Sequence, residues 1–375
     1  MNTEFLEHVV EQPLLLDHSK VGWWRERVET WDRGEKIAPV TMDVAWTRRC
    51  QAACSFCYAQ AQASEGGEIT KDIAFQFLED AAEIGVKGVS LISDGESTLA
   101  PFYAESIRYG TSLGLKMGAG TNGILLKRDV LDQILPYLSY LRFNFSAGEK
   151  KRYAEIMGLR QTFFDLVIQN IRDAVEIVQQ RELACTVNMN LVSEPKDADQ
   201  LLPFARLAVA LHVKYAIIKH TATDPDGILM VNYKDYEPLY ETFRQCESLS
   251  TEDCRIVVKW SRIQDEGKRA YTKCFGTPFI LQMSGNGLIA PCGPLFNSKY
   301  AAFHIGNITK TRFRDLFKSE RYWEVISYLA SDDFNPQDRC AVNCLQHNTN
   351  DWLFKYKNGS VTFPQGDMPI HAEFI

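Results

Sequence analysis

Residues 40–58 read VTMDVAWTRRCQAACSFCY, an apolar run that leads directly into three closely spaced cysteines. The run over residues 40–46 has the length and the β-branched content of a buried strand. Cys50, Cys54 and Cys57 follow within eight residues. Such a loop can wrap three thiolates around a cubane iron–sulfur cluster, which normally takes four cysteines. One iron would then stay open to a further ligand.

An alternation of strands and helices continues beyond this loop. The predicted strands are residues 40–46, 88–92, 115–119, 141–145, 185–190 and 215–219, and the predicted helices are residues 71–84, 102–113, 163–180 and 198–211. Strand–helix units in series predict an α/β fold with a parallel sheet and helices outside it. With right-handed crossovers, six units curl into a partial (β/α)6 TIM-like barrel. Catalytic residues are then expected at the C-terminal strand ends.

Five parts are predicted along the chain. Residues 1–37 form an N-terminal helical extension with Trp23, Trp24 and Trp31 as apolar anchors, and residues 38–230 form the barrel. A turn-rich segment at 223–227 marks the boundary to a linker region, residues 231–270, with a connecting helix at 233–246. Residues 271–347 form a small α+β module with short strands and spaced cysteines. The tail, residues 348–375, receives no assignment.

Composition narrows the classes of partner and compartment. The apolar fraction of 45% and the charged fraction of 24% are those of a globular protein. The net charge of −7 argues against a large nucleic-acid partner, which usually needs a basic face. No signal peptide and no apolar run of the ~18 residues that a membrane span needs are found, so a cytoplasmic protein without membrane contact is expected. In a reducing compartment, ten cysteines point to metal binding or catalysis rather than to disulfides.

The Cys-x3-Cys-x2-Cys loop, with Phe56 just before its last cysteine, resembles the signature of the radical S-adenosylmethionine (SAM) superfamily. The resemblance implies a 4Fe-4S cluster whose open iron is chelated by the amino and carboxylate groups of SAM. It also implies reductive cleavage of SAM to a 5′-deoxyadenosyl radical that abstracts a substrate hydrogen, with electrons from a partner such as flavodoxin or ferredoxin. A zinc site is the alternative, but zinc usually takes four ligands and no fourth lies nearby.

Further segments fall where this superfamily binds SAM. Ser93-Asp94-Gly95-Glu96-Ser97 resembles its Gly-Gly-Glu-Pro motif, with Asp94 and Ser97 as departures, and Thr121-Asn122-Gly123 is similar to its Thr-Asn-Gly turn. The resemblance implies cofactor contacts from Phe56, Asp94, Gly95, Glu96, Asn122, Asn144, Ser146 and Arg160, while Asn188 and Asn190 could hydrogen-bond the adenosine. Ordinary turn, strand-end and helix-start roles remain the alternatives for these residues.

A second cysteine set follows in the C-terminal module and consists of Cys274, Cys292, Cys340 and Cys344. Asn286-Gly287 suits a hairpin turn that brings the first two together. The set resembles the shorter, twitch form of the SPASM/twitch extension of radical SAM enzymes, which implies one auxiliary 4Fe-4S cluster. A structural zinc is the alternative. Cys185 is expected in the core, and Cys246 and Cys254 are expected to be free unless one of them joins the second cluster.

Candidates for proton transfer cluster at the end of the last predicted barrel strand. Lys219 and His220 end that strand, and Asp224 and Asp226 follow. Oxidising an alcohol or thiol requires a base within hydrogen-bond reach of the reacting group. His220 is the better base by its unperturbed pKa. The two aspartates could instead only shape the turn.

Three functions remain open at this point. The first is oxidation of a small-molecule, nucleoside or peptide substrate, with the auxiliary cluster accepting the second electron. The second is peptide maturation or cyclisation, and the third is redox-neutral modification of nucleotides or nucleic acid. A zinc-stapled interaction module does not explain why the first cysteine trio follows a barrel-like strand.

Overall fold

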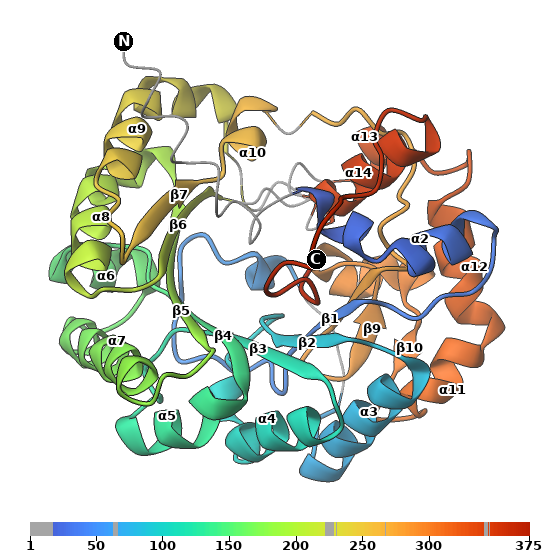
Figure 1. Ribbon diagram of the computed structural model, residues 1–375, viewed down its shortest axis with the longest axis horizontal. Helices are drawn as coiled ribbons and strands as arrows, with labels where there is room; N and C mark the ends of the chain where they lie inside the picture. The colour runs from blue at the N-terminus through green and yellow to red at the C-terminus, as the bar shows by residue number, and fades with distance from the viewer. Residues whose placement is uncertain are drawn as a thin grey trace.

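The computed structural model describes residues 18–62, 67–221, 229, 231–266, 268–340, 344 and 346–375. Within these residues one ten-stranded sheet runs in the order β10-β9-β8-β1-β2-β3-β4-β5-β6-β7. Figure 1 shows the sheet curving around the middle of the molecule, with helices on its outside. The prediction of an α/β fold with a parallel, partly closed barrel is confirmed.

The parallel strands match the predicted series closely. They are β1 Thr41–Val44, β2 Gly88–Leu91, β3 Lys116–Thr121, β4 Leu138–Asn144, β5 Thr186–Ser193, β6 Tyr215–His220 and β7 Arg255–Val258. Each pairs in parallel with the next. β8 Ile280–Met283 pairs in parallel with the other edge of β1, and β9 Leu288–Ala290 and β10 Gly306–Asn307 continue the sheet antiparallel.

Local sequence explains where the outer helices begin and end. In α3, Lys71–Ile84, the Thr70 side chain accepts a hydrogen bond from Ile73 N, and Gly85 ends the helix at φ 101°. The other barrel helices are α4 Tyr103–Ser112, α5 Arg128–Ile134, α6 Lys150–Met157, α7 Thr162–Gln180, α8 Leu201–Ala210, α9 Tyr240–Ser248 and α10 Trp260–Gln264. The remaining helices are α2 Arg25–Asp32, α11 Phe313–Lys318, α12 Glu320–Leu329, α13 Pro336–Arg339 and α14 His347–Lys357.

The sheet crosses two of the predicted domain boundaries. The region predicted as a linker contains β7, and the first strand of the predicted C-terminal module, β8, lies beside β1. β7 comes only after residues 221–239 have interrupted the regular strand–helix series, and 15 residues separate β8 from the short helix α10, so neither continues the rhythm that reveals β1 to β6. The β8–β9 hairpin forms around Asn286-Gly287 as predicted, with Gly287 at φ 85°.

Strand alternation gives the sheet an apolar outer face and a polar inner face. Residues such as Met42, Val44, Leu141 and Phe143 pack into the main core under the helices. The alternate residues point to the inner face, because successive side chains of a strand point to opposite sides. The inner residues include Asp43, Ser90, Tyr140, Arg142, Asn188 and Gln282.

The C-terminal tail, unassigned from the sequence, closes the N-terminal ends of the strands on the inner face. Its residues 369–375, here called the tail plug, bring their backbone to inner positions: Thr41 Oγ1 donates to Glu373 O at 2.7 Å. The Phe374 ring packs edge-on against Tyr140, with centroids 5.0 Å apart. Lys20 Nζ donates to Phe374 O at 2.9 Å and Trp24 Nε1 to Ala372 O at 3.0 Å. The two ends of the described chain therefore form one floor, with the C terminus near the centre of Figure 1.

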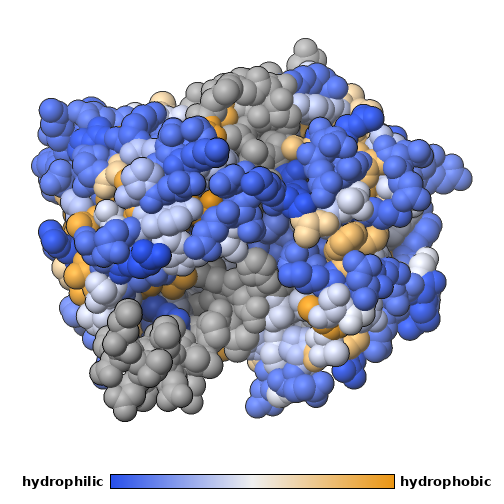
Figure 2. All heavy atoms as spheres, turned by 90° about the horizontal axis from the view of Figure 1, so that it is seen from above, coloured by the Kyte–Doolittle hydropathy of each residue, from blue (hydrophilic) through white to orange (hydrophobic). Residues whose placement is uncertain are grey.

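The face of the molecule seen in Figure 2 is mainly hydrophilic, with hydrophobic residues scattered over it. Among the described residues, the exposed large hydrophobic side chains are Leu125, Tyr137, Tyr328, Met368 and Ile370. None of the described helices has the length and apolar character to cross a membrane.

Candidate active site

The cysteine loop after β1 is held by backbone contacts on two sides. Glu96 N donates to Arg49 O at 2.8 Å, and Ala53 N donates to Met157 O at 3.1 Å. Two glycines allow these close approaches. A Cβ on Gly95, at φ 74°, would lie 2.1 Å from Thr47 O, and one on Gly158, at φ 60°, would lie 2.5 Å from Ala53 O. The loop therefore lies between the segment after β2 and the C-terminal end of α6.

The three thiols of this loop lie close enough to affect one another. Burial, with a smaller contribution from the charges of Cys57 and Cys50, raises the pKa of Cys54 to about 12. Burial also raises the pKa of Cys50 and of Cys57. Asn122 Nδ2 lies 3.9 Å from the Cys50 Sγ, so an amide donor faces a prospective thiolate. Binding iron here must displace protons, as metal sites built from thiols require.

Glu96, predicted to meet the SAM amino group, is buried in a hydrogen-bond network of its own chain. Its carboxylate accepts from Asn122 N at 2.7 Å, Thr121 Oγ1 at 2.9 Å and Thr98 Oγ1 at 2.8 Å. Thr98 N adds a fourth contact at 3.3 Å. Three of these donors meet Oε1, whereas Asn122 N is the one donor among the described residues that meets Oε2, so Oε2 keeps one of its two acceptor positions. In this structure Glu96 positions the Thr121–Asn122 turn, and its contact with SAM stays a prediction.

Asp94 braces the cysteine loop against the β8–β9 hairpin. Its carboxylate accepts from Ser284 Oγ at 2.6 Å, Gly285 N at 2.7 Å and Arg48 Nε at 3.2 Å. Burial raises the pKa of Asp94, and these hydrogen bonds oppose that rise. The Arg48 ion pair, which sequence reasoning did not single out, thus anchors the segment leading into Cys50.

The other residues predicted to bind SAM lie around the C-terminal ends of β4 and β5. Ser146 Oγ accepts from Val192 N at 3.1 Å, and Asn190 Nδ2 lies 3.5 Å from Asn144 Oδ1. Asn188 is buried on the inner face, two residues before Asn190. Phe56 packs partly buried against the main core. Arg160 is exposed before α7, with its guanidinium 5.2 Å from the Phe163 ring centre.

The four cysteines of the second set lie close enough for their charges to act on one another. The charges of Cys340, Cys344 and Cys274 all act on the buried thiol of Cys292, whose pKa is raised well above normal, chiefly by burial. Asn350 Nδ2 lies 3.7 Å from both Cys274 Sγ and Cys344 Sγ. This set of four thiols with an amide donor fits an auxiliary iron–sulfur cluster. Cys185, Cys246 and Cys254 are buried in the core.

The geometry bears on the zinc alternative. Among the described residues, no three His, Cys, Asp or Glu side chains converge closely enough to hold one metal ion. A structural zinc gathers four ligands around one centre. In a cubane cluster each thiolate binds a different iron, so the sulfurs need not converge on one point. The spacing of the cysteines is compatible with clusters, and zinc stays the alternative for the second set.

Residues that follow Cys57 in the chain contact the residue that follows Cys292. Gln62 Nε2 donates to Gly293 O at 2.7 Å. A Cβ on Gly293, the residue after Cys292, would lie 3.0 Å from the Tyr58 ring. Burial raises the pKa of Tyr58, and the charges of Asp94, Cys57 and Cys292 add to the rise. Residues directly following a cysteine of each set are thus in contact.

The proton-transfer candidates divide between the two faces of β6. Lys219 lies two residues after Ile217, so it shares the inner face of β6 with that residue, and it is half-buried. His220 is buried on the other side, with its ring 5.3 Å from that of Tyr233. The alternation favours Lys219 over His220 for reaching the barrel interior. Asp224 and Asp226 lie outside the described residues.

Sequence reasoning missed the charged residues inside the barrel. Asp43 accepts from Gln282 Nε2 at 3.2 Å, and burial raises its pKa to about 6. Arg142 lies on the same inner face, on β4. A signal was available, because Asp43 and Arg142 each interrupt a run otherwise read as an apolar strand.

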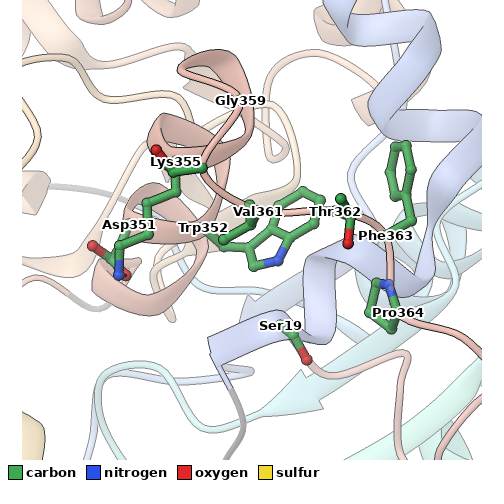
Figure 3. A pocket seen from close by; sticks show the side chains of 10 residues that line it. Ser19, Asp351, Trp352, Lys355, Gly359, Val361, Thr362, Phe363 and Pro364 are labelled. Atoms are coloured by element: carbon green, nitrogen blue, oxygen red, sulfur yellow. Dashed lines mark hydrogen bonds and ion pairs between the residues drawn. The ribbon is translucent and has the colours of Figure 1, made fainter.

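A pocket of about 640 Å³ lies elsewhere, between the start of the described chain, α14 and the tail. Figure 3 shows Trp352, Phe363 and Pro364 lining it, with Ser19 across from them. None of the predicted site residues lines this pocket.

Comparison with known proteins agrees with this geometry. The profile of the Radical SAM superfamily matches residues 44–202. The AdoMet-dependent heme synthase of Methanosarcina barkeri is 24% identical over 302 residues, covering 74% of this chain and 82% of that protein. The tungsten-containing aldehyde ferredoxin oxidoreductase cofactor-modifying protein of Pyrococcus furiosus is 20% identical and covers 74% and 80%.

Two solved structures share the fold. SuiB of Streptococcus suis bound to S-adenosylmethionine has a TM-score of 0.62 at 16% identity, covering 81% of this chain and 72% of SuiB. The enzyme anSMEcpe with bound AdoMet has a TM-score of 0.57 at 13% identity, covering 86% and 97%. A parallel barrel with a three-cysteine loop after its first strand defines a class of SAM-cleaving iron–sulfur enzymes. Residues 44–202 form the radical SAM domain of this chain, and the chain is an enzyme.

Proposed function

We propose that the chain binds two 4Fe-4S clusters and oxidises a small organic substrate by two electrons at the expense of SAM. Cys50, Cys54 and Cys57 hold the SAM-binding cluster. The second set, Cys274, Cys292, Cys340 and Cys344, holds the auxiliary cluster. When bound, the first cluster supplies the electron that cleaves SAM to the 5′-deoxyadenosyl radical, which removes a substrate hydrogen.

The observation that carries this proposal is the contact between the two cysteine sets. Tyr58 and Gln62 follow the first set and meet Gly293, which directly follows Cys292. Two redox groups held this close suit a reaction that removes two electrons one at a time. A purely structural second site would need no such contact.

Protein residues have positioning and proton-handling roles in this proposal. Glu96 fixes the turn that brings the Asn122 amide to Cys50, and Asp94 fixes the hairpin beside Arg48. Lys219, on the inner face of β6, would take, as a neutral amine, the proton released when an alcohol or thiol is oxidised. The yields of 5′-deoxyadenosine and of oxidised product should be compared in Lys219→Met and His220→Asn. The variant that still forms 5′-deoxyadenosine but no oxidised product identifies the base.

The decisive experiment measures iron and SAM cleavage together. Protein reconstituted anaerobically should hold roughly eight irons, four for each cysteine-ligated cubane. Changing Cys50, Cys54 and Cys57 together to Ala should halve the iron and abolish 5′-deoxyadenosine formation with dithionite. Changing Cys274 and Cys292 to Ala should also halve the iron but leave this substrate-free cleavage in place. Stoichiometric zinc without iron in anaerobically purified protein contradicts the proposal.

A tetrapyrrole is the first substrate to test, since one of the relatives, a heme synthase, matches 74% of this chain. Candidate substrates should be incubated with SAM and dithionite and their mass changes measured. A mass loss of two hydrogens, or of a larger group, with one 5′-deoxyadenosine per turnover supports oxidation. An isomer of unchanged mass favours the redox-neutral alternative, and product from a precursor peptide favours the maturase alternative.

A further inference from the structure

Strand register arranges the polar inner face in successive layers. The layer next to the tail plug contains Gln282, Asp43, Ser90, Gly118, Tyr140 and Thr186, which are paired across neighbouring strands. The next layer contains Gly120, Arg142 and Asn188, again paired across β3, β4 and β5. Asn144 and Asn190 pair one layer further on, at the end of β4.

Arg142 is the prominent group of the second layer. Its Nε atom is buried and makes no hydrogen bond within the described chain. Its charge acts on Asp43, but the two side chains form no ion pair within the described residues, and Asp43 instead accepts from Gln282. A buried guanidinium donor without an acceptor is costly, so such groups normally meet a partner.

The neighbouring strand is shaped to make room for this guanidinium. Gly120 faces Arg142 across the β3–β4 pair, and a Cβ there would lie 3.0 Å from an Arg142 terminal nitrogen and 2.8 Å from the Ile92 side chain. On the other side, the buried Oδ1 of Asn188 also makes no hydrogen bond. Its amide can rotate to offer its NH2 group instead. Two neighbouring strands thus each place at this level a buried polar atom without a hydrogen bond in the described chain, Arg142 Nε and Asn188 Oδ1.

This level lies between a closed floor and the predicted SAM site. Tyr140, two residues before Arg142, packs against the tail plug through Phe374 and His371. Asn144 and Asn190, predicted to bind SAM, lie two residues beyond Arg142, which is about 7 Å at the rise of a strand. A ligand that reaches Arg142 must come from the side of the cysteine loops and would lie deeper than SAM.

We propose that Arg142, supported by Asn188, binds a carboxylate of the substrate, so that the enzyme acts on an organic acid. The planar guanidinium fork matches a carboxylate in two parallel hydrogen bonds. This inference rests on the proposed function for the statement that the bound acid is the substrate. The carboxylate site itself does not depend on which reaction follows.

The test uses reconstituted holoenzyme loaded with SAM and radiolabelled succinate as the probe, measured by equilibrium dialysis. Succinamide, which is neutral, and inorganic phosphate serve as competitors. Wild-type protein should bind succinate saturably, and Arg142→Gln should weaken this binding about ten-fold to a hundred-fold, as expected for a lost charge-assisted pair. Gly120→Ala should weaken it in the same direction with the charge still present. The surface variant Arg108→Gln should bind as wild type.

Several outcomes overturn the inference. These are no saturable succinate binding by wild type, equal binding by Arg142→Gln, and competition by succinamide as strong as by unlabelled succinate. Stronger competition by phosphate assigns the site to a phosphorylated ligand. If Arg142→Gln instead lowers SAM affinity with succinate binding intact, the guanidinium serves the SAM carboxylate. Iron content and substrate-free 5′-deoxyadenosine formation, measured on the same samples, report separately on the proposed function.

Discussion

Glu96 offers a sharp test of how this site is built. Its side chain is 4% exposed, and its two oxygens accept from Asn122 N, Thr121 Oγ1 and both donors of Thr98. In Glu96→Gln one oxygen becomes an NH2 group. Placed toward Asn122, it meets a backbone N–H across 2.7 Å, donor against donor. If the amide is rotated by 180°, the NH2 group instead meets the Thr98 N–H. Either way one buried N–H loses its acceptor.

The expected cost follows from the lost contact. A hydrogen bond to a charged group contributes about 1.5–3 kcal/mol, and an unpaired buried donor adds a desolvation penalty. We therefore expect Glu96→Gln to lower the free energy of unfolding by about 2–3 kcal/mol, measured by urea denaturation of the apoprotein. SAM affinity, measured by dialysis on reconstituted protein, should fall as well because the Asn122 turn moves. Glu105→Gln is the control, since Glu105 is half exposed and forms a surface ion pair with Lys71.

Two results would refute this reasoning in different ways. A change in unfolding free energy below about 0.5 kcal/mol, as is usual for surface substitutions, means that the network does not stabilise the fold. Normal stability and iron content with lost SAM binding means that Glu96 contacts SAM directly. Unchanged SAM affinity in the destabilised variant removes the residue from cofactor binding altogether.

Three further predictions concern other parts of the molecule. Burial lowers the pKa of His371 from 6.5 to about 4, so as the pH falls the unfolded state binds the proton before the folded state does. The free energy of unfolding should therefore be constant above about pH 6.5 and fall by at most about 2 kcal/mol by pH 5, measured by urea denaturation. His371→Gln should abolish this loss. Gly95→Ala should lower bound iron by up to half and stop SAM cleavage, because its Cβ would lie 2.1 Å from Thr47 O. Gly114→Ala is the control: Gly114 has a similar φ but open space around its Cβ position, so this variant should keep its iron. Asn350→Asp would place a carboxylate against two thiolates of the second cysteine set and should lower that iron alone, which full iron content would contradict.

The sequence predicted those parts of the fold that repeat. Strands β1 to β6 and helix α3 follow from apolar runs and helical period, and the predicted helix at 71–84 has the bounds of α3. Strands β7 and β8 were missed as members of the barrel sheet, because the strand–helix series is interrupted before each of them. Their place depends on tertiary pairing with β6 and β1.

For the site, residue type and spacing predicted which side chains gather but not what each one contacts. The first cysteine trio lies within one loop and Cys274 and Cys292 flank one hairpin, so their proximity follows from local sequence, whereas Cys340 and Cys344 approach them from about 50 residues further along the chain. Asp94 and Glu96 were expected at SAM, but their hydrogen bonds go to the hairpin and to the turn after β3. Those partners lie far along the chain, and no local pattern encodes them. The tail plug escaped prediction for the same reason, since its polar contacts go to Lys20, Trp24 and Thr41.

The brace at Asp94 changes how the C-terminal cysteine region should be regarded. Gly95 and Gly285 both pack against the backbone of Thr47 and Arg48, one from the loop after β2 and one from the β8–β9 hairpin. Asp94 joins these two loops by accepting from Gly285 N and Arg48 Nε. A displacement of the hairpin must therefore be transmitted to the segment that leads into the first cysteine trio, because close-packed backbone cannot absorb it. The hairpin is therefore a structural support of the first cysteine trio, and it is a shift of its backbone, rather than loss of the cluster proposed beside it, that should disturb the trio through this contact.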